Sequence, residues 1–260
     1  MLKDYALNIR KNIIELANRS KSPHVSSALS CVDILTTLYF DVLNLDDYEN
    51  RDIFLLSKAH SAMALYATLY ERGVLSRDEL FSYYQNGGIL PAHIDRFSNR
   101  YIEISAGSLG HGLPIGLGIA HSLKLKKSNR KVFVLIGDGE SQEGSIWESA
   151  MFAPKLKLNN LTLVVDRNNL QGYGRADELL SYEPIDKKFK IFHWEVFRID
   201  GHNFKELRNA FYADTKKPKV IIADTTKGYG VDFMEDKLIW HYYIVTDEVK
   251  KRALKALDEK

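Results

Sequence analysis

Two short apolar runs, each followed by a polar turn, constrain the fold of this chain more than any other feature. Val132–Ile136 precedes Gly137–Glu140, and Leu161–Val165 precedes Asp166–Asn169. Short, β-branched runs bounded by turn formers are typical of buried parallel strands, and Gly144–Lys157 between them is long enough for a crossover helix. The sequence therefore predicts a βαβ unit at this point.

The polar turns after these two strands predict a metal site. Because the carboxyl ends of neighbouring parallel strands lie side by side, Asp138 and Asn168 should meet at one edge of the sheet. A carboxylate, an amide oxygen and a backbone carbonyl would hold a hard cation such as Mg²⁺ and leave it open to phosphate oxygens. Gly137 and Gly139 permit positive φ and close approach of an anion to backbone N–H groups. The alternative is a simple turn followed by a helix cap at Asn168–Asn169, but the doubled pattern favours a metal–diphosphate site.

The rest of the chain alternates between predicted strands and helices. Further strands are expected at Asp52–Ser57, Glu195–Ile199 and Lys219–Asp224. Helices are expected at Leu2–Ala17, from a cap near Ser30 through Phe40, and at Ala62–Glu71, Ser76–Tyr84, Pro114–Lys126, Phe204–Tyr212 and Thr246–Lys260, with Tyr182–Phe189 as a charged connection. This alternation predicts an α/β fold in which a doubly wound, mostly parallel sheet carries helices on both faces. We expect one domain over residues 1–260, beginning with a helical segment over about residues 1–45.

Composition narrows the class of protein. With 45% hydrophobic and 27% charged residues, the 260-residue chain is typical of a globular protein. A net charge of +2 with scattered Lys and Arg gives no indication of nucleic-acid binding, and no apolar run approaches membrane-spanning length. The amphipathic first segment does not resemble a signal peptide, so we expect a cytoplasmic protein. Cys31 is the only cysteine, which excludes an intramolecular disulfide and a cysteine-based zinc site.

Three histidines are candidates for chemistry. His24 lies in a loop between helices, His60 follows the first predicted strand, and His93 ends the Gln85–His93 loop. By position alone, a loop histidine is commonly exposed, and His60 has the alternative role of a helix N-cap. A zinc site is a competing interpretation of the three together, but they lack paired ligand spacing. Gly107–Gly112 does not complete a dinucleotide-binding motif, which disfavours NAD.

These motifs together resemble thiamine diphosphate enzymes. Gly137–Glu148, Ser105–Gly112 and Val165–Gln171 are similar to segments of the N-terminal subunit of split, two-chain transketolases, and the resemblance covers nearly the whole chain. It implies thiamine diphosphate and Mg²⁺ as cofactors and a fold that binds the diphosphate. The implied reaction transfers a two-carbon ketol unit from a ketose to an aldose, with the cofactor acting as electron sink.

The resemblance also implies roles for individual residues. His24, His60 and His93 match histidines that bind sugar and transfer protons, and Glu143 matches a catalytic glutamate near the aminopyrimidine-activating acid. Asp138, Asn168 and the backbone oxygen of Leu170 match metal ligands. The cofactor would contact His60, Gly110, His111, Gly112, Gly137, Asp138, Gly139, Glu140, Asn168, Leu170 and His241. By position alone, Glu143 and Glu148 are equally compatible with a solvated helix face.

Several positions depart from the family pattern. Pro23, Ala59 and Ala92 stand where the family usually has glycine, each beside one of the three histidines. Ser26–Ser27 and Ile94 are further departures near His24 and His93. The tail Lys227–Glu235 and Trp240–His241 matches the family, but Tyr242–Tyr243 does not. We interpret these changes as an altered sugar pocket.

The resemblance implies a missing half of the enzyme. A C-terminal partner subunit would bind the aminopyrimidine, in an α2β2 heterotetramer acting on phosphorylated or nucleotide-linked sugars. Ala62–Tyr70 and Pro114–Leu123 are the candidate contact helices. Two alternatives stay open: a subunit of another thiamine diphosphate enzyme (2-oxoacid decarboxylating or deoxyxylulose-phosphate-type), or a non-catalytic half of such a complex.

Overall fold

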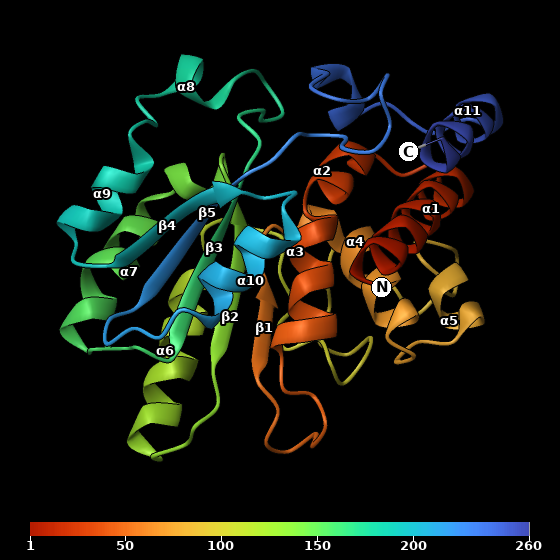
Figure 1. Cartoon of the computed structure of the whole chain (residues 1–260). Helices are drawn as coiled ribbons and strands as arrows, with labels where there is room; N and C mark the ends of the chain where they lie inside the picture. Colours follow the sequence, from red (N-terminus) through yellow and green to blue (C-terminus); the bar gives the residue numbers. More distant parts are fainter. Residues whose placement is uncertain (260) are drawn as a thin grey trace.

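A five-stranded parallel sheet forms the centre of the protein (Figure 1), in a computed structural model that describes residues 1–259. Its strands are β1 (Ile53–Leu56), β2 (Val132–Gly137), β3 (Leu161–Arg167), β4 (Glu195–Asp200) and β5 (Lys219–Asp224). They lie in the order β1-β2-β3-β5-β4, and every neighbouring pair is parallel. The apolar runs of β2 and β3 are buried because helices cover both faces of these strands, whereas the edge strand β4 is partly exposed. The predicted α/β fold is confirmed.

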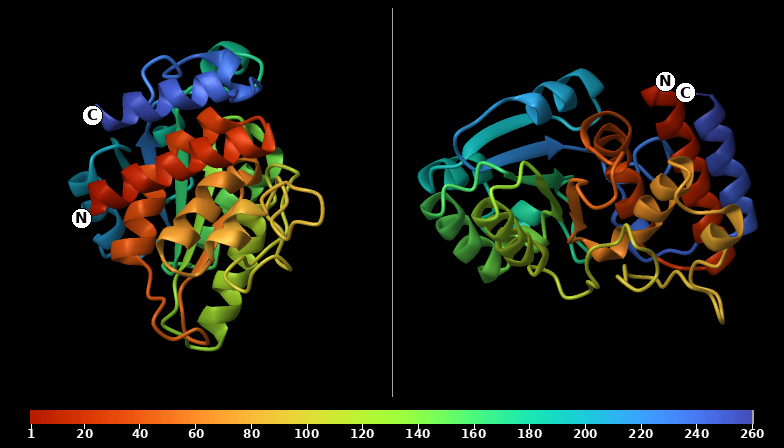
Figure 2. Two further views of the ribbon diagram at one scale, coloured as in Figure 1. Left: turned by 90° about the vertical axis from the view of Figure 1, so that its right-hand side faces the viewer. Right: turned by 90° about the horizontal axis from the view of Figure 1, so that it is seen from below.

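Helices on opposite faces of the sheet make the fold doubly wound. α10 (Phe204–Tyr212) contacts β4 and β5 on one face, and α6 (Gly112–Leu125) contacts β1, β2 and β3 on the other, where α7 (Gly144–Lys155) packs beside it (Figure 2). Gly116 allows the close approach of α6, because a Cβ at this position would lie 2.5 Å from Val134 Cγ2. α7 is the crossover helix predicted between β2 and β3.

A layer of helices beside β1 brings the two ends of the chain together (Figure 2). α1 (Leu2–Ser20) packs against α4 (Ala62–Glu71) and α11 (Asp247–Asp258), and Lys11 Nζ lies 2.5 Å from the Asp258 carboxylate. Lys260, the predicted end of the last helix, lies outside the described residues. Among the residues described, no helix combines the length and apolar character that crossing a membrane requires.

The helix predicted from Ser30 through Phe40 is wrong in its start and its continuity. The structure has α2 (Val25–Ser30), α3 (Val32–Thr37) and a π-helical turn at Leu38–Val42. Ser30 therefore ends a helix instead of capping one. Its hydroxyl donates to the Asp166 carboxylate at 2.6 Å, so it is not available to a helix N-terminus. α2 begins directly after His24, which adopts φ 72°.

Three other predictions need correction. The connection predicted at 182–189 contains α9 (Ile185–Ile191), preceded by the short α8 (Ala176–Leu179), because Ile185 and Phe189 bury one helical face. α5 (Arg77–Phe81) is shorter than predicted, with a capping box formed by Ser76 and Glu79. α4 is not an available contact helix, because its residues from 62 to 69 are all buried within the chain.

Candidate active site

A cavity of about 520 Å³ lies where the loops after β1, β2, β3 and β5 meet. Each loop supplies part of the wall: His60 follows β1, Asp138 follows β2, Asn168 follows β3 and Lys227 follows β5. This is the edge at which open parallel sheets bind ligands, and the volume suits a small organic molecule.

Asp138 and Asn168 lie together at this edge because β2 and β3 are paired in parallel, with Gly137 opposite Asp166. The Asp138 carboxylate accepts a hydrogen bond from the Asn169 backbone N–H, and Asn168 Oδ1 accepts one from the Leu170 N–H at 3.1 Å. The alternative role of Asn168–Asn169 as a helix cap is wrong, since α8 begins only at Ala176. Oxygen atoms from a carboxylate, an amide and a nearby carbonyl are thus brought to one wall of the cavity.

The metal-binding candidate Asp138 ionises less readily than an ordinary carboxyl group. The side chain is 2% exposed, and burial together with the nearby Asp166 carboxylate raises its pKa to about 6. Behind it, Lys58 Nζ forms a buried ion pair with Asp166. A strongly shifted carboxyl facing a cavity is typical of a functional site, and a bound cation would favour the charged form.

Glu140 fixes the turn after β2 from within. It is 2% exposed, and its carboxylate accepts hydrogen bonds from the Ser57 hydroxyl, from the Gly110 N–H at 3.0 Å and from the Gly137 N–H at 3.4 Å. Burial raises its pKa. Glu140 therefore ties the loops after β1 and β2 to the start of α6.

The three predicted histidines converge at the other side of the cavity, and His241 joins them. The His24 ring centroid lies 5.3 Å from that of His60, 6.3 Å from His93 and 5.0 Å from His241. The His24 backbone N–H donates to the His241 carbonyl at 2.9 Å, which fixes the two loops to each other. The alternative role of His60 as a helix N-cap is wrong, because Ser61 occupies that position before α4.

These histidines are neutral near pH 7. Burial, with the charges of His93 and Lys227, lowers the pKa of His24 to about 4, and burial with Lys227 lowers that of His241 to about 3. Burial and the Lys58 charge hold the pKa of His60 well below its ordinary value, and burial lowers that of His93. Neutral imidazoles accept hydrogen bonds and protons from hydroxyl groups, as proton transfer on a sugar requires.

Lys58 and Lys227 are functional candidates that the sequence interpretation did not assign. Lys227 Nζ donates to the Leu170 carbonyl at 2.7 Å and lies 2.9 Å from His241 Nδ1. Burial and the Lys58 charge lower its pKa to about 8. The match of the Lys227–Glu235 segment to the family tail was a signal for Lys227. Lys58 directly follows the apolar strand β1, at the edge where ligands bind.

Tyr242, one of the departures from the family, also lines the cavity. Its ring centroid lies 4.5 Å from that of His241 and 6.0 Å from that of His24. A Cβ added to Gly172 would lie 2.5 Å from the Tyr242 hydroxyl, so glycine is needed for this approach. The departure therefore changes the wall beside the histidines.

Some predicted cofactor contacts do not line the cavity. Gly107 and Leu109 lie in its wall, whereas Gly110, His111 and Gly112 do not, and the His111 side chain is exposed. The expected positive φ after β2 is wrong: Gly139 has φ −60°. Gly137 instead provides space, because no atom lies within 4 Å of a Cβ built there.

The two predicted glutamates of α7 lie in different places. Glu143 precedes the helix and lines the cavity, whereas Glu148 lines a separate groove between α6 and α7. Both side chains are exposed. Neither contacts the histidines.

The donors of the cavity fit Mg²⁺ and a diphosphate. Asp138, Asn168 and the Leu170 carbonyl supply the hard oxygen ligands that Mg²⁺ prefers, beside the cationic Lys227. Within residues 1–259, the buried Ser27 Oγ and Gln171 Nε2, both in the cavity wall, have no hydrogen-bond partner. Buried polar atoms usually have partners, so these two are suited to a ligand. Over the same residues, no three His, Cys, Asp or Glu side chains are arranged around a common metal position.

Known proteins share this sequence over its whole length. The family described as transketolase, thiamine diphosphate binding domain, matches residues 2–254. One relative, from Phocaeicola vulgatus, carries the name of the first of the subunits of apulose-4-phosphate transketolase; it is 37% identical over 258 residues, covering 96% of this chain and 92% of that protein. Another, the 6-deoxy-6-sulfo-D-fructose transketolase subunit SqwG of a Clostridium species, is 35% identical over 265 residues, covering 99% of this chain and 96% of that protein.

Larger transketolases match over less than half of their own length. Human transketolase is 35% identical over 248 residues, which are 92% of this chain and 39% of the human protein. The crystal structure of transketolase from Campylobacter jejuni superposes with a TM-score of 0.89 at 27% identity, covering 99% of this chain and 42% of that one. The chain thus matches the two subunits nearly end to end and a part of the larger proteins.

Proposed function

The chain belongs to the transketolase family, and from this premise we propose that it is the diphosphate-binding half of a two-chain, Mg²⁺-dependent transketolase. In this proposal it transfers a two-carbon ketol unit from a ketose to an aldose only when a C-terminal partner subunit is bound. The observation that carries the proposal is one cavity with two chemically distinct walls. Asp138, Asn168 and the Leu170 carbonyl form one wall, and the neutral histidines form the other.

The anionic end of the cofactor is assigned to the wall after β2 and β3. Asp138, Asn168 and the Leu170 carbonyl would hold Mg²⁺, and Lys227 would balance the phosphate charge. When bound, thiamine diphosphate supplies the electron sink that lets a carbon–carbon bond beside a ketose carbonyl break and form. This chain's residues bind and orient the reactants around that chemistry.

Proton transfer is assigned to the histidine wall. His24, His60 and His93 are neutral near pH 7, so each accepts a hydrogen bond or a proton from a sugar hydroxyl. His241 lies between them and Lys227 and links the two walls. Glu143, at the rim, is placed to meet the partner's share of the cofactor.

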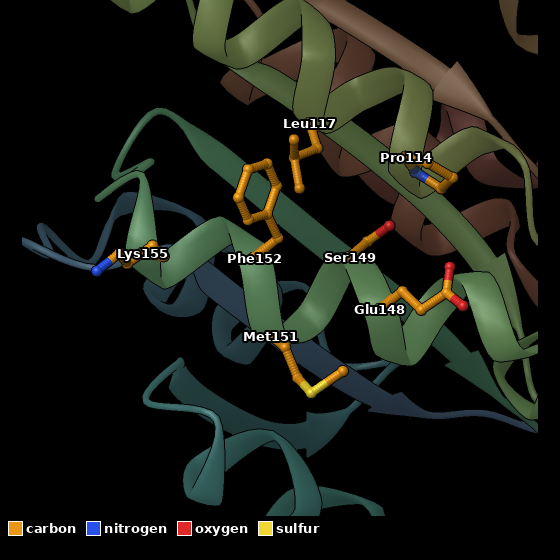
Figure 3. A pocket seen from close by; sticks show the side chains of 7 residues that line it. All are labelled: Pro114, Leu117, Glu148, Ser149, Met151, Phe152 and Lys155. Carbon is orange, nitrogen blue, oxygen red and sulfur yellow. The ribbon is translucent and has the colours of Figure 1, made fainter.

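The groove between α6 and α7 is our proposed contact for the partner (Figure 3). Phe152 lies beside Leu117 across the groove, and Phe152 and Met151 remain 53% and 54% exposed. Large exposed side chains beside an apolar groove are typical of protein interfaces. Two similar proteins are themselves named as transketolase subunits, which supports a second chain. We propose an α2β2 heterotetramer.

Substitution of Phe152 by aspartate tests this contact. Loss of a buried aromatic anchor should weaken association with the partner by at least about tenfold, or about 1.4 kcal/mol. Tyr212→Asp is the matched control, because Tyr212 is 56% exposed on α10, across the sheet. Analytical ultracentrifugation of each variant with the partner would measure the difference. Equal weakening by both variants would argue against the groove.

Reconstitution tests the activity itself. The purified chain, the candidate C-terminal partner and their mixture should be assayed with thiamine diphosphate, Mg²⁺ and a panel of phosphorylated and nucleotide-linked ketoses. We expect ketol transfer only in the mixture. Turnover by this chain alone would overturn the two-chain proposal, and a mixture that decarboxylates 2-oxoacids without ketol transfer would favour the other thiamine diphosphate enzymes.

A non-catalytic half is the weaker alternative. It was suggested by alanine or proline beside each histidine, where the family has glycine. The cavity nevertheless keeps the candidate metal ligands and the complete histidine cluster, and such functional side chains have no structural reason to stay together in an inactive subunit. We therefore attribute these substitutions to sugar preference.

A further inference from the structure

A buried chain of polar contacts links the helical layer to the loop after β5. Asp33 on α3 is 2% exposed, and its Oδ2 lies 2.6 Å from Arg10 Nη2 on α1. The same oxygen lies 2.8 Å from Nδ1 of His202, in the loop between β4 and α10. Burial opposes ionisation of Asp33, but Arg10 and the hydrogen bond from His202 outweigh it and hold its pKa below the ordinary value.

The partners of His202 fix the position of its proton. Nε2 accepts a hydrogen bond from the Thr226 backbone N–H at 2.9 Å, so it carries no proton. Nδ1 is therefore the protonated nitrogen and donates to Asp33. The ring also stacks on Tyr229, with centroids 3.5 Å apart and planes at 12°. Asp33 and Tyr229 thus fix both the tautomer and the orientation of the imidazole.

The loop that His202 holds carries groups of the proposed cofactor site. On one side of Thr226, the Thr225 hydroxyl donates to the Asp166 carboxylate. On the other side, Lys227 Nζ reaches the Leu170 carbonyl at 2.7 Å and lines the cavity. Gly201 permits this packing, because a Cβ there would lie 2.4 Å from Thr225 Cγ2. The backbone between two site residues is therefore fixed from behind by one histidine.

We infer that His202 is a positioning residue for the cofactor diphosphate: oriented by Asp33, it holds the Thr225–Lys227 loop so that Lys227 Nζ faces the anionic end of the cavity. The inference rests on the proposed function, since it assigns the diphosphate to that end. His202 does not line the cavity and acts only through the loop. Its loss should therefore affect diphosphate binding and loop order together, with Lys227 as the link.

A double-mutant cycle tests this link. His202→Phe keeps a ring to stack on Tyr229 but removes both nitrogens, and Lys227→Met removes the charge. In the complex with the partner, calorimetry should show that His202→Phe weakens Mg²⁺-dependent thiamine diphosphate binding by about 10- to 100-fold, the range typical of residues that orient direct ligands. The double variant should lose little more than Lys227→Met alone, because residues that act as one unit are non-additive. Losses that multiply would overturn the inference.

Hydrogen exchange provides a readout that needs no cofactor. In the full chain without ligand, His202→Phe should speed amide exchange at residues 225–228, and Leu80→Ala in α5 should not, although it also removes buried packing. If His202→Phe does not fold, His202→Gln takes its place in both measurements. Unchanged exchange at these amides, or wild-type cofactor affinity, would overturn the role of His202. If the wild-type complex binds no thiamine diphosphate, the proposed function fails, and the exchange comparison still decides whether His202 holds the loop.

Discussion

Replacing Lys58 by methionine should strongly destabilise the protein, because it leaves a carboxylate buried without its counter-ion. Lys58 is 1% exposed and Asp166 is not exposed at all. Lys58 Nζ pairs with Asp166 and also donates to the Ser27 carbonyl at 3.1 Å. Methionine fills a similar volume, so the change removes charge and hydrogen bonds while keeping most of the packing.

The remaining contacts set the magnitude. The Ser27 carbonyl keeps a hydrogen bond from the Ser61 hydroxyl at 2.9 Å, so its loss is small. Asp166 keeps the hydroxyls of Ser30 and Thr225 but loses its only cationic hydrogen-bond donor among the described residues. Breaking a buried ion pair costs about 3–5 kcal/mol, and two remaining hydroxyl donors favour the lower end, near about 3 kcal/mol. For a chain of this size that corresponds to a melting temperature lower by about 6–12 °C.

Urea unfolding at pH 7, followed by circular dichroism, measures this free energy. Lys251→Met is the matched control, since Lys251 is exposed on α11 and should change stability by less than about 0.5 kcal/mol. Lys58→Met with Asp166→Asn removes the unpaired charge and should be more stable than Lys58→Met alone. A loss below about 1 kcal/mol for Lys58→Met, or a double variant less stable than either single one, would refute the reasoning.

Two further predictions concern the histidine cluster and the Asp33 ion pair. Alanine at His24, His60 or His93 should lower ketol transfer by about 10²–10⁴-fold while calorimetry shows nearly unchanged cofactor affinity, and losses below tenfold at all three would contradict their roles in proton transfer. Asp33→Asn should cost about 3–5 kcal/mol at pH 7, because it leaves a buried arginine unpaired. Since the folded-state pKa of Asp33 lies below its unfolded value, this difference should be complete above about pH 4 and shrink as the pH falls further; urea unfolding at pH 7 and pH 3.5 would show a constant difference if the ion pair were unimportant.

The sheet could be predicted from sequence because its central strands are buried on both faces. Continuous apolar runs such as Val132–Ile136 have no other stable place than a covered parallel sheet. Elements with weak local signals were predicted less well. Ser30 looked like a helix cap, but it bonds to Asp166, a residue far away in the chain. α9 was missed because only Ile185 and Phe189 mark its buried face among charged residues.

The site was predictable where strand ends carry distinctive side chains. Asp138 and Asn168 follow adjacent strands, so their proximity follows from the parallel order alone. The roles of Lys227 and His202 depend on contacts between loops that are distant in sequence, and no local pattern reports a buried lysine or the tautomer of a histidine. Motifs similar to the family indicated the three catalytic candidates. Their convergence could be seen only once the loops were placed.

The most direct test of the account is calorimetry of thiamine diphosphate and Mg²⁺ binding to the Asp138→Ala variant in the complex with the partner. We expect Mg²⁺-dependent binding to be abolished, while thermal unfolding without ligand shows no loss of stability, because the variant removes a buried carboxyl whose pKa is raised by burial. Asp177→Ala, at an exposed position in α8, should bind as the wild type does. Wild-type affinity and Mg²⁺ dependence in Asp138→Ala would contradict the assignment of the diphosphate site to this edge of the sheet.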